Sequence, residues 1–161
     1  MKFTKGYWMN LPGVTNTDAV QVREVKVEND RVYLYTVPYH ADMRAMGGPL
    51  LEMYISSPQP DIIRTEAYHF MGSNQKMPAF ELNDAHCALE VENTETTVTI
   101  KSGNTKLVIG KNPCSFDYYY KDKKLTSIGN RFGNAMISTI STPDGNYMRA
   151  QMNLDIGEKV Y

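Results

Sequence analysis

The sequence predicts an all-β fold, and three observations support this prediction. Apolar and polar residues alternate along most of the chain, which is the period of a strand with one buried face. Turn residues recur about every 8–12 residues, a spacing typical of β-sandwiches. No long stretch shows the periodicity of a helix. We therefore expect one β-sandwich of about eleven mostly antiparallel strands.

The first expected hairpin joins residues 19–27 to residues 31–37 through turn residues at 29–30. The valines of its first strand change face part-way along the strand. Because one extra residue reverses the facing of a strand, this change predicts a β-bulge at Arg23 and Glu24.

The same alternation predicts further strand pairs, each separated by turn residues. The pairs are 50–56 with 61–70, 87–91 with 98–100 and then 105–110, 114–120 with 125–128, and 135–141 with 147–156. Pro58 and Pro60 mark the first of these connections, because proline cannot donate a hydrogen bond to a neighbouring strand. Two long segments, 38–50 and 71–85, do not fit strands, and loops of this length in a β domain are usually functional or mobile.

Length and charge limit the classes of protein to which the chain can belong. A chain of 161 residues with a net charge of −1 is one domain without a basic run for nucleic acid. Its apolar runs are far shorter than the ~20 residues of a membrane span, and its start lacks the apolar core of a signal peptide. We expect a cytoplasmic protein in which Cys87 and Cys114 are reduced core thiols.

The residues themselves predict no metal, cofactor or catalytic site. His40, His69 and His86 are too far apart in sequence for a local metal motif, and hydrogen-bonded imidazoles are the expected alternative. The chain has no nucleophile elbow and no phosphate-binding loop. No two carboxylates are placed together for glycosidic chemistry.

Two ligand-binding alternatives remain open from single residues. The Gly6-x-Trp8 motif resembles the entry strand of lipocalin-like carriers, in which a late arginine such as Arg149 packs on the tryptophan. Such barrels have about eight strands, fewer than we expect here. Tyr119 should face outward, where it would either stack on a sugar, as in a carbohydrate-binding module, or pair across strands.

Short motifs along nearly the whole chain match one enzyme family. The matching residues are Gly6, Trp8, Pro12, Gly13, Glu92, Asn93, Thr94, Glu95, Lys101, Ser102, Gly103, Asn104, Leu154, Gly157, Glu158 and Tyr161. In this pattern the chain resembles the N-terminal domain of the bacterial α-xylosidases of glycoside hydrolase family 31. Its departures from the family are concentrated in the two long loops.

The resemblance implies a galactose-mutarotase-like β-sandwich over residues 1–161, truncated before a catalytic (β/α)8 barrel. The parent enzyme would remove terminal α-linked xylose or glucose from oligosaccharides with retention, using two aspartates on the barrel. Neither aspartate falls in this chain, so we expect it to contain no catalytic residue and to be inactive alone. The implied partners are the enzyme's own barrel, its oligosaccharide substrate and further copies of the enzyme, with no nucleic acid and no membrane.

One loop of the family's N-terminal domain helps to wall the sugar pocket, and the corresponding segment here is 72–82. By this resemblance, Asn74, Gln75 and Lys76 are candidates to hydrogen-bond sugar hydroxyls, and Phe80 is a candidate to stack on a sugar ring. The alternative for each residue is a solvated loop without a ligand contact. Trp8 is then expected to pack in a core.

Overall fold

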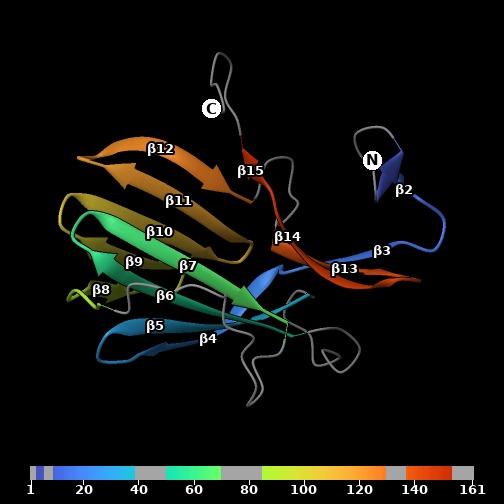
Figure 1. The fold of residues 1–161 in the computed structure, drawn as a ribbon. Coiled ribbons are helices and arrows are strands. Elements are labelled where there is room, and N and C mark those ends of the chain that lie inside the picture. The colour runs from blue at the N-terminus through green and yellow to red at the C-terminus, as the bar shows by residue number, and fades with distance from the viewer. Residues whose placement is uncertain (1–2, 6–8, 39–49, 70–84, 130–136, 154–161) are drawn as a thin grey trace.

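The computed structural model describes residues 3–5, 9–38, 50–69, 85–129 and 137–153. Within these ranges the chain forms fifteen strands and no helix. Figure 1 shows two larger sheets facing each other, with a three-stranded sheet extending from one end. The predicted all-β sandwich is confirmed. No helix in the described ranges is long and apolar enough to cross a membrane.

The smaller of the two facing sheets has four antiparallel strands in the order β4-β5-β6-β7. They are β4 (Gln21–Val27), β5 (Arg31–Val37), β6 (Leu51–Gln59) and β7 (Ile62–Tyr68). The register between β4 and β5 shifts between Val22 and Glu24, so the predicted bulge is confirmed. A second shift, between Ser56 and Gln59, lies where Pro58 precedes the turn to β7.

The larger facing sheet has six strands in the order β15-β12-β11-β10-β9-β8. They are β8 (Glu90–Asn93), β9 (Thr97–Ser102), β10 (Thr105–Lys111), β11 (Cys114–Tyr120), β12 (Lys123–Ile128) and β15 (Met152–Asn153). Tyr118 lies opposite the buried Leu107, whereas Tyr119 lies opposite Lys106 on the outer face. The Lys106 ammonium lies 5.0 Å from the centre of the Tyr119 ring. Tyr119 therefore faces outward as predicted, and its cross-strand partner is a lysine.

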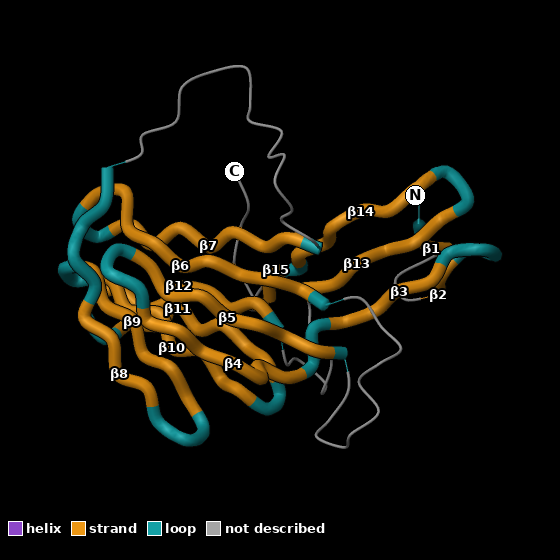
Figure 2. Tube along the Cα trace, turned by 90° about the horizontal axis from the view of Figure 1, so that it is seen from below, coloured by secondary structure: helices purple, strands orange, loops and turns teal. Residues whose placement is uncertain are grey.

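The third sheet has the order β14-β13-β3 and extends beyond the sandwich in two perpendicular views (Figures 1 and 2). Its strands are β3 (Thr15–Asp18), β13 (Ile137–Thr142) and β14 (Gly145–Ala150), and a small hairpin of β1 (Thr4–Lys5) and β2 (Met9–Asn10) precedes them. The single strand predicted over 147–156 is wrong. Gln151 interrupts it: β14 pairs with β13, whereas β15 pairs with β12, so the chain passes from one sheet to another.

Four short strands account for the difference between the fifteen observed and the about eleven predicted. These are β1, β2, β3 and β15, each of two to four residues. β1, β2 and β3 contain too little alternation to be recognised in the sequence, and β15 was merged with β14 in the predicted strand over 147–156. The pairing of β3 and β15 depends on strands that are distant in the chain.

The core lies between the two facing sheets and is built from the alternate residues of their central strands. Fully buried members are Val32, Leu34, Met53 and Ile55 on one sheet and Val98, Ile100, Leu107, Ile109 and Phe116 on the other. This alternation confirms the period used to predict the strands. Backbone hydrogen bonds also connect the sheets: the Cys114 N–H donates to the Val20 carbonyl at 2.7 Å.

One end of the sandwich is closed by polar contacts between its sheets. Asp61, in the β6–β7 turn with φ 66°, accepts a hydrogen bond from the Asn104 backbone N–H through its carboxylate. The Thr105 hydroxyl donates to the Asp61 carbonyl at 2.7 Å. Nearby, the buried hydroxyls of Ser57 and Ser102 lie 2.7 Å apart. We call this cluster of contacts the Asp61 junction.

Candidate functional site

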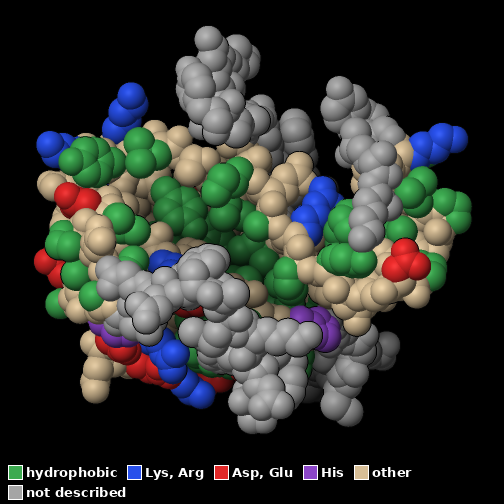
Figure 3. Space-filling view, viewed as in Figure 1, with side chains coloured by type: hydrophobic (Ala, Val, Ile, Leu, Met, Phe, Trp, Pro, Cys, Tyr) green, Lys and Arg blue, Asp and Glu red, His purple; other side chains and the backbone are tan. Residues whose placement is uncertain are grey.

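The candidate site is a groove of about 500 Å³ beside the edge strand of the four-stranded sheet. One wall is the inner face of β7, formed by Ile63, Thr65 and Ala67, and Tyr118 and Ile128 belong to its floor. We call it the β7 groove. In Figure 3 hydrophobic side chains gather in a hollow at the centre of this face of the molecule.

The opposite wall of the β7 groove comes from the last strands that the structure describes. The three-stranded sheet contributes Ile137, Met148, Arg149 and Ala150, and β15 contributes Met152. Met148 and Met152 are 41% and 58% exposed. The groove therefore arises where the chain crosses from the three-stranded sheet to the six-stranded sheet.

The polar groups of the β7 groove are few. The Thr65 and Tyr118 hydroxyls lie 2.9 Å apart, which places β7 against β11. Burial raises the pKa of Tyr118, and the hydrogen bond with Thr65 acts in the opposite direction. Arg149 is the one charged residue among the described residues that line the groove, and its guanidinium donates to the Gln151 side-chain oxygen at 2.5 Å. The described lining residues therefore suit apolar side chains and include no pair of acid and base.

A half-buried polar cluster lies across the three-stranded sheet, next to the β7 groove. Asp18 accepts a hydrogen bond from the Asn16 amide at 2.6 Å. Burial raises the pKa of Asp18, although Asn16 and the positive charge of Arg149 oppose the rise. The Asn16 side-chain oxygen and the Ser138 hydroxyl are buried without a hydrogen-bond partner. Asn16 and Arg149 therefore stabilise the charged form of Asp18 only in part, and burial determines the direction of the pKa shift.

Tyrosines on the outer face of the four-stranded sheet do not form an open platform for a sugar. The rings of Tyr33 and Tyr54 lie 5.3 Å apart with a tilt of 55°. Lys26 lies 5.4 Å from the Tyr33 ring centre, and Arg31 lies 4.5 Å from the Tyr54 ring centre. Burial, together with the nearby Glu52 carboxylate, raises the pKa of Tyr33 to about 12. The cations already occupy the ring faces that a sugar would need.

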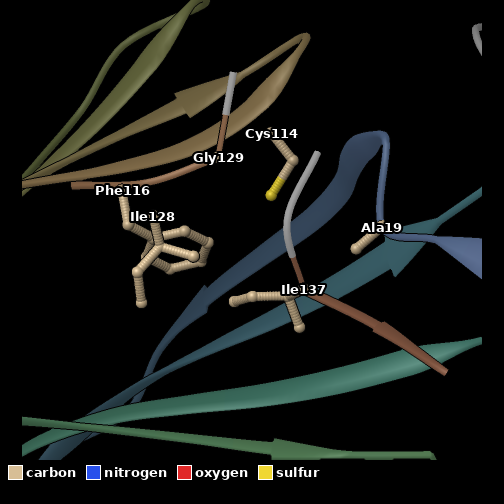
Figure 4. Close-up of a pocket in the computed structure, with 6 residues that line it drawn as sticks. All are labelled: Ala19, Cys114, Phe116, Ile128, Gly129 and Ile137. Atoms are coloured by element: carbon tan, nitrogen blue, oxygen red, sulfur yellow. The ribbon is translucent and has the colours of Figure 1, made fainter. Parts of the chain in front are cut away.

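Cys114 is a packing residue and not a nucleophile. Its thiol points into a space between Ala19, Phe116, Ile128 and Ile137 (Figure 4). This space has no room for a water molecule. Burial raises the pKa of Cys114 to about 12, so the thiol stays protonated at neutral pH.

The other predicted thiol and two of the predicted histidines lie at or near the surface. Cys87 is free but only partly buried, so the prediction of a core thiol holds for Cys114 and not for Cys87. His86 lies 3.5 Å from the Asp30 carboxylate, and His69 is exposed. In the part of the chain that the structure describes, no three histidine, cysteine or acidic side chains gather around a possible metal position.

The residues predicted to contact substrate lie outside the described part of the chain. Asn74, Gln75, Lys76 and Phe80 all fall within 70–84. Trp8 and His40 also fall outside the described residues. The sequence reasoning missed the β7 groove, because its walls combine strands that are far apart along the chain. The alternation that turns Ile63, Thr65 and Ala67 inward was the available signal.

Comparison with known proteins finds relatives that are much longer than this chain. The α-xylosidase XylQ of Lactiplantibacillus pentosus is 24% identical over 168 residues, which cover 100% of this chain and 21% of that protein. An α-xylosidase of Emericella nidulans is 25% identical over 182 residues, covering 100% of this chain and 23% of that protein. The chain is similar to α-xylosidases along its whole length. It spans only about a fifth of each relative.

Solved structures show the same fold as part of larger chains. The cycloalternan-forming enzyme of Listeria monocytogenes, solved with a pentasaccharide substrate, matches 86% of this chain with a TM-score of 0.60 and 17% identity. An uncharacterised protein of the same organism matches equally well. In both cases the match covers 12% of the solved chain. No family model matches this sequence.

Proposed function

We propose that this chain is the non-catalytic N-terminal β-sandwich domain of a retaining α-xylosidase or α-glucosidase of glycoside hydrolase family 31. The observation that carries this proposal is the similarity of the whole chain to about a fifth of two α-xylosidases. The remaining part of the parent enzyme, about four fifths of its length, would contain the (β/α)8 barrel with its two catalytic aspartates. The parent enzyme would act in the cytoplasm on terminal α-linked xylose or glucose of oligosaccharides.

The contribution of this domain would be structural, with one loop at the substrate. The β7 groove is apolar, as expected for a surface that packs on protein and not on a sugar. The segment 72–82 is proposed to reach the sugar pocket, where Asn74, Gln75 and Lys76 bind hydroxyls and Phe80 stacks on a ring. The parent enzyme is proposed to be a homo-oligomer.

The test compares the 161-residue chain with the intact parent enzyme on chromogenic α-xylosides and α-glucosides. We expect turnover by the parent and none by the 161-residue chain. Turnover by the chain alone would contradict the proposal, as would a parent protein that cleaves neither substrate. In the active parent, Phe80→Ala should raise KM, whereas the matched surface variant Tyr119→Ala should leave KM unchanged.

Two alternative functions are separated by binding measurements on the isolated chain. A carbohydrate-binding module would bind xylo-oligosaccharides in calorimetry, and we expect no heat of binding. A lipocalin-like carrier would need a closed barrel, but the described strands form four separate sheets. The small-ligand alternative therefore has no structural support in the described ranges.

A further inference from the structure

The outer faces of the two large sheets differ in composition. Four tyrosines and two arginines point outward from the four-stranded sheet: Tyr33, Tyr35, Tyr54, Tyr68, Arg31 and Arg64. Within the described residues, the outer face of the six-stranded sheet has one tyrosine and no arginine, and three lysines share a row with that tyrosine: Lys101, Lys106 and Lys124. Tyrosine and arginine are enriched at the centre of protein interfaces, whereas lysine is depleted there. The outer face of the four-stranded sheet is therefore the one suited to a protein partner.

The tyrosine rings at the centre of this face are held in place by their neighbours. The Tyr54 ring lies 5.3 Å from the Tyr33 ring and 6.1 Å from the Tyr68 ring. The Tyr33 hydroxyl donates to the Glu52 carboxylate at 3.2 Å, and the Arg31 guanidinium lies 4.5 Å from the Tyr54 ring centre. Rings that are already fixed lose little conformational freedom when a partner docks on them.

The two edge strands of this sheet carry opposite charges in its central row. The strand register places Lys26 of β4, Tyr33 of β5, Tyr54 of β6 and Glu66 of β7 directly beside one another. Lys26 and Glu66 are three strand spacings apart, about 14 Å, so they do not pair within one copy of the chain. The row therefore presents a cation at one end, an anion at the other end and two aromatic rings between them.

The neighbouring row has the opposite order of charges. Arg31, Ser56 and Arg64 lie side by side on β5, β6 and β7. Glu28 follows β4 and forms an ion pair with Arg31 at 2.5 Å, so an acidic residue ends this row on the β4 side and Arg64 ends it on the β7 side. Rotating the face by a half turn about an axis along the strands would bring each of these end charges over an opposite charge.

We propose that two copies of this chain dock through the outer faces of their four-stranded sheets, about a twofold axis that runs along the strands between β5 and β6. This axis exchanges β4 with β7 and β5 with β6, because an isologous interface uses the same patch on both copies. Lys26 then meets the partner's Glu66, Glu28 meets the partner's Arg64, and Tyr33 meets the partner's Tyr54. The proposal rests on the homo-oligomer in the proposed function and not on the glycosidase activity.

The first experiment is sedimentation equilibrium of the 161-residue chain. A face of four strands by three rows is smaller than the about 800 Å² that each partner of a stable interface buries. We therefore expect a weak, reversible dimer that is populated above about 100 µM. A chain that stays monomeric up to about 1 mM would overturn the proposal.

The second experiment reverses the two charges that meet across the twofold axis. Lys26→Glu and Glu66→Lys should each raise the dissociation constant of the dimer at least about tenfold, because each variant places like charges opposite each other. The double variant should return to within about threefold of the original value, since the pair is restored with its signs exchanged. Circular dichroism checks that the variants are folded. A double variant as weak as the single variants would overturn the twofold arrangement.

The matched control is Lys124→Glu on the outer face of the six-stranded sheet. The Lys124 and Lys26 side chains are 48% and 58% exposed, and each forms an ion pair on its own sheet, with Asp117 at 2.7 Å and with Glu24 at 3.0 Å. The control should leave the dissociation constant unchanged, and an equal loss in both variants would contradict docking through the tyrosine face. A dimer that only Met152→Glu weakens would lie at the β7 groove and would also overturn the proposal.

Activity of the intact parent enzyme separates failure of this proposal from failure of the proposed function. A parent that cleaves α-xylosides, together with a chain that stays monomeric, overturns the interface and leaves the function in place. A dimer that follows the charge-reversal pattern, together with a parent that cleaves neither α-xylosides nor α-glucosides, supports the interface and overturns the function.

Discussion

The Asp61 junction and the β7 groove are two regions of one sandwich in which the facing sheets meet differently. At the junction, a turn of the narrower sheet meets a turn of the wider sheet, and every polar group named there has a partner across the gap. At the groove, the wider sheet continues past the narrower one, and within the described ranges Met148 and Met152 are 41% and 58% exposed. The first region closes the sandwich with hydrogen bonds, whereas the second leaves apolar side chains exposed beside the core.

The difference shows which end of this domain is stabilised by its own contacts. Buried polar groups are tolerated at the Asp61 junction because they are hydrogen-bonded to each other. Exposure of the apolar groove surface to water is unfavourable, and a contiguous apolar surface is unusual on a monomer. We therefore expect substitutions near the junction to affect stability, and substitutions in the groove to affect association.

The largest expected effect compares two identical truncations. Ile109→Ala removes a fully buried side chain from the closed core and should lower the free energy of unfolding by about 2–5 kcal/mol. Ile63→Ala removes a half-buried side chain from the groove wall and should cost about 1 kcal/mol. Urea unfolding of both variants measures the difference. Equal losses would mean that the groove is closed in the isolated chain.

The next effect tests the hydrogen bonds of the Asp61 junction. Asp61→Ala should cost about 1–3 kcal/mol, because the backbone N–H and the side-chain amide of Asn104 lose the carboxylate that accepts their hydrogen bonds. Asp122→Ala is the matched control, since Asp122 also has positive φ, at 64°, but its side chain makes an exposed ion pair with Lys106. Urea unfolding should show a clearly smaller loss for the control. Similar losses would attribute both effects to the backbone.

A smaller effect tests how closely the two turns approach. Gly103 has φ 59°, and an added Cβ would overlap the Asp61 carboxylate. Gly103→Ala should therefore lower stability by about 1–2 kcal/mol more than Gly13→Ala. Gly13 also has a positive φ, at 80°, but its added Cβ would make only ordinary contact with Pro143, at 3.4 Å. Thermal unfolding of the two variants measures this difference, and its absence would indicate that the Asp61 side chain moves aside at no cost.

The smallest effect concerns pH and the polar cluster beside the groove. Because the pKa of Asp18 is raised in the folded state, the native protein binds more protons than the unfolded chain at pH values just above 3.8. This contribution to stability is present below pH 3.8 and is lost as pH rises through the raised pKa. Relative to the original protein, Asp18→Asn should become progressively more stable from pH 3.8 toward neutral pH.

Urea unfolding at several pH values measures the change, with Asp144→Asn on the exposed β13–β14 turn as the control. The control should show no such gain with pH. A parallel pH dependence of Asp18→Asn and the original protein would contradict the burial of Asp18.

Local features of the fold could be predicted from the sequence because their signals lie within a few residues of each other. The hairpins that contain β4 to β7 follow from alternation and turn residues, and the bulge after Val22 follows from a change of facing. The break at Gln151 could not be predicted, because residues on both sides continue an apolar alternation. Only the pairing partners, β13 before the break and β12 after it, separate the two strands.

The candidate site was less predictable than the fold. The loop with Asn74 and Phe80 was selected by family resemblance, and it lies outside the described residues. The β7 groove has no sequence motif, because an uncovered sheet face consists of the same apolar residues as a covered one. Its existence depends on how many strands each sheet contains.

The sequence by itself determined which side chains of each hairpin face inward, because the two-residue period of a strand is a local property. It also carried the similarity to α-xylosidases over the whole chain. Only the tertiary structure decided which sheets face each other and where each one ends. These outcomes depend on contacts such as that between Thr65 and Tyr118, which are 53 residues apart in the chain. The pairing of distant strands, and not the period within one strand, therefore determines where the sandwich is closed and where it is open.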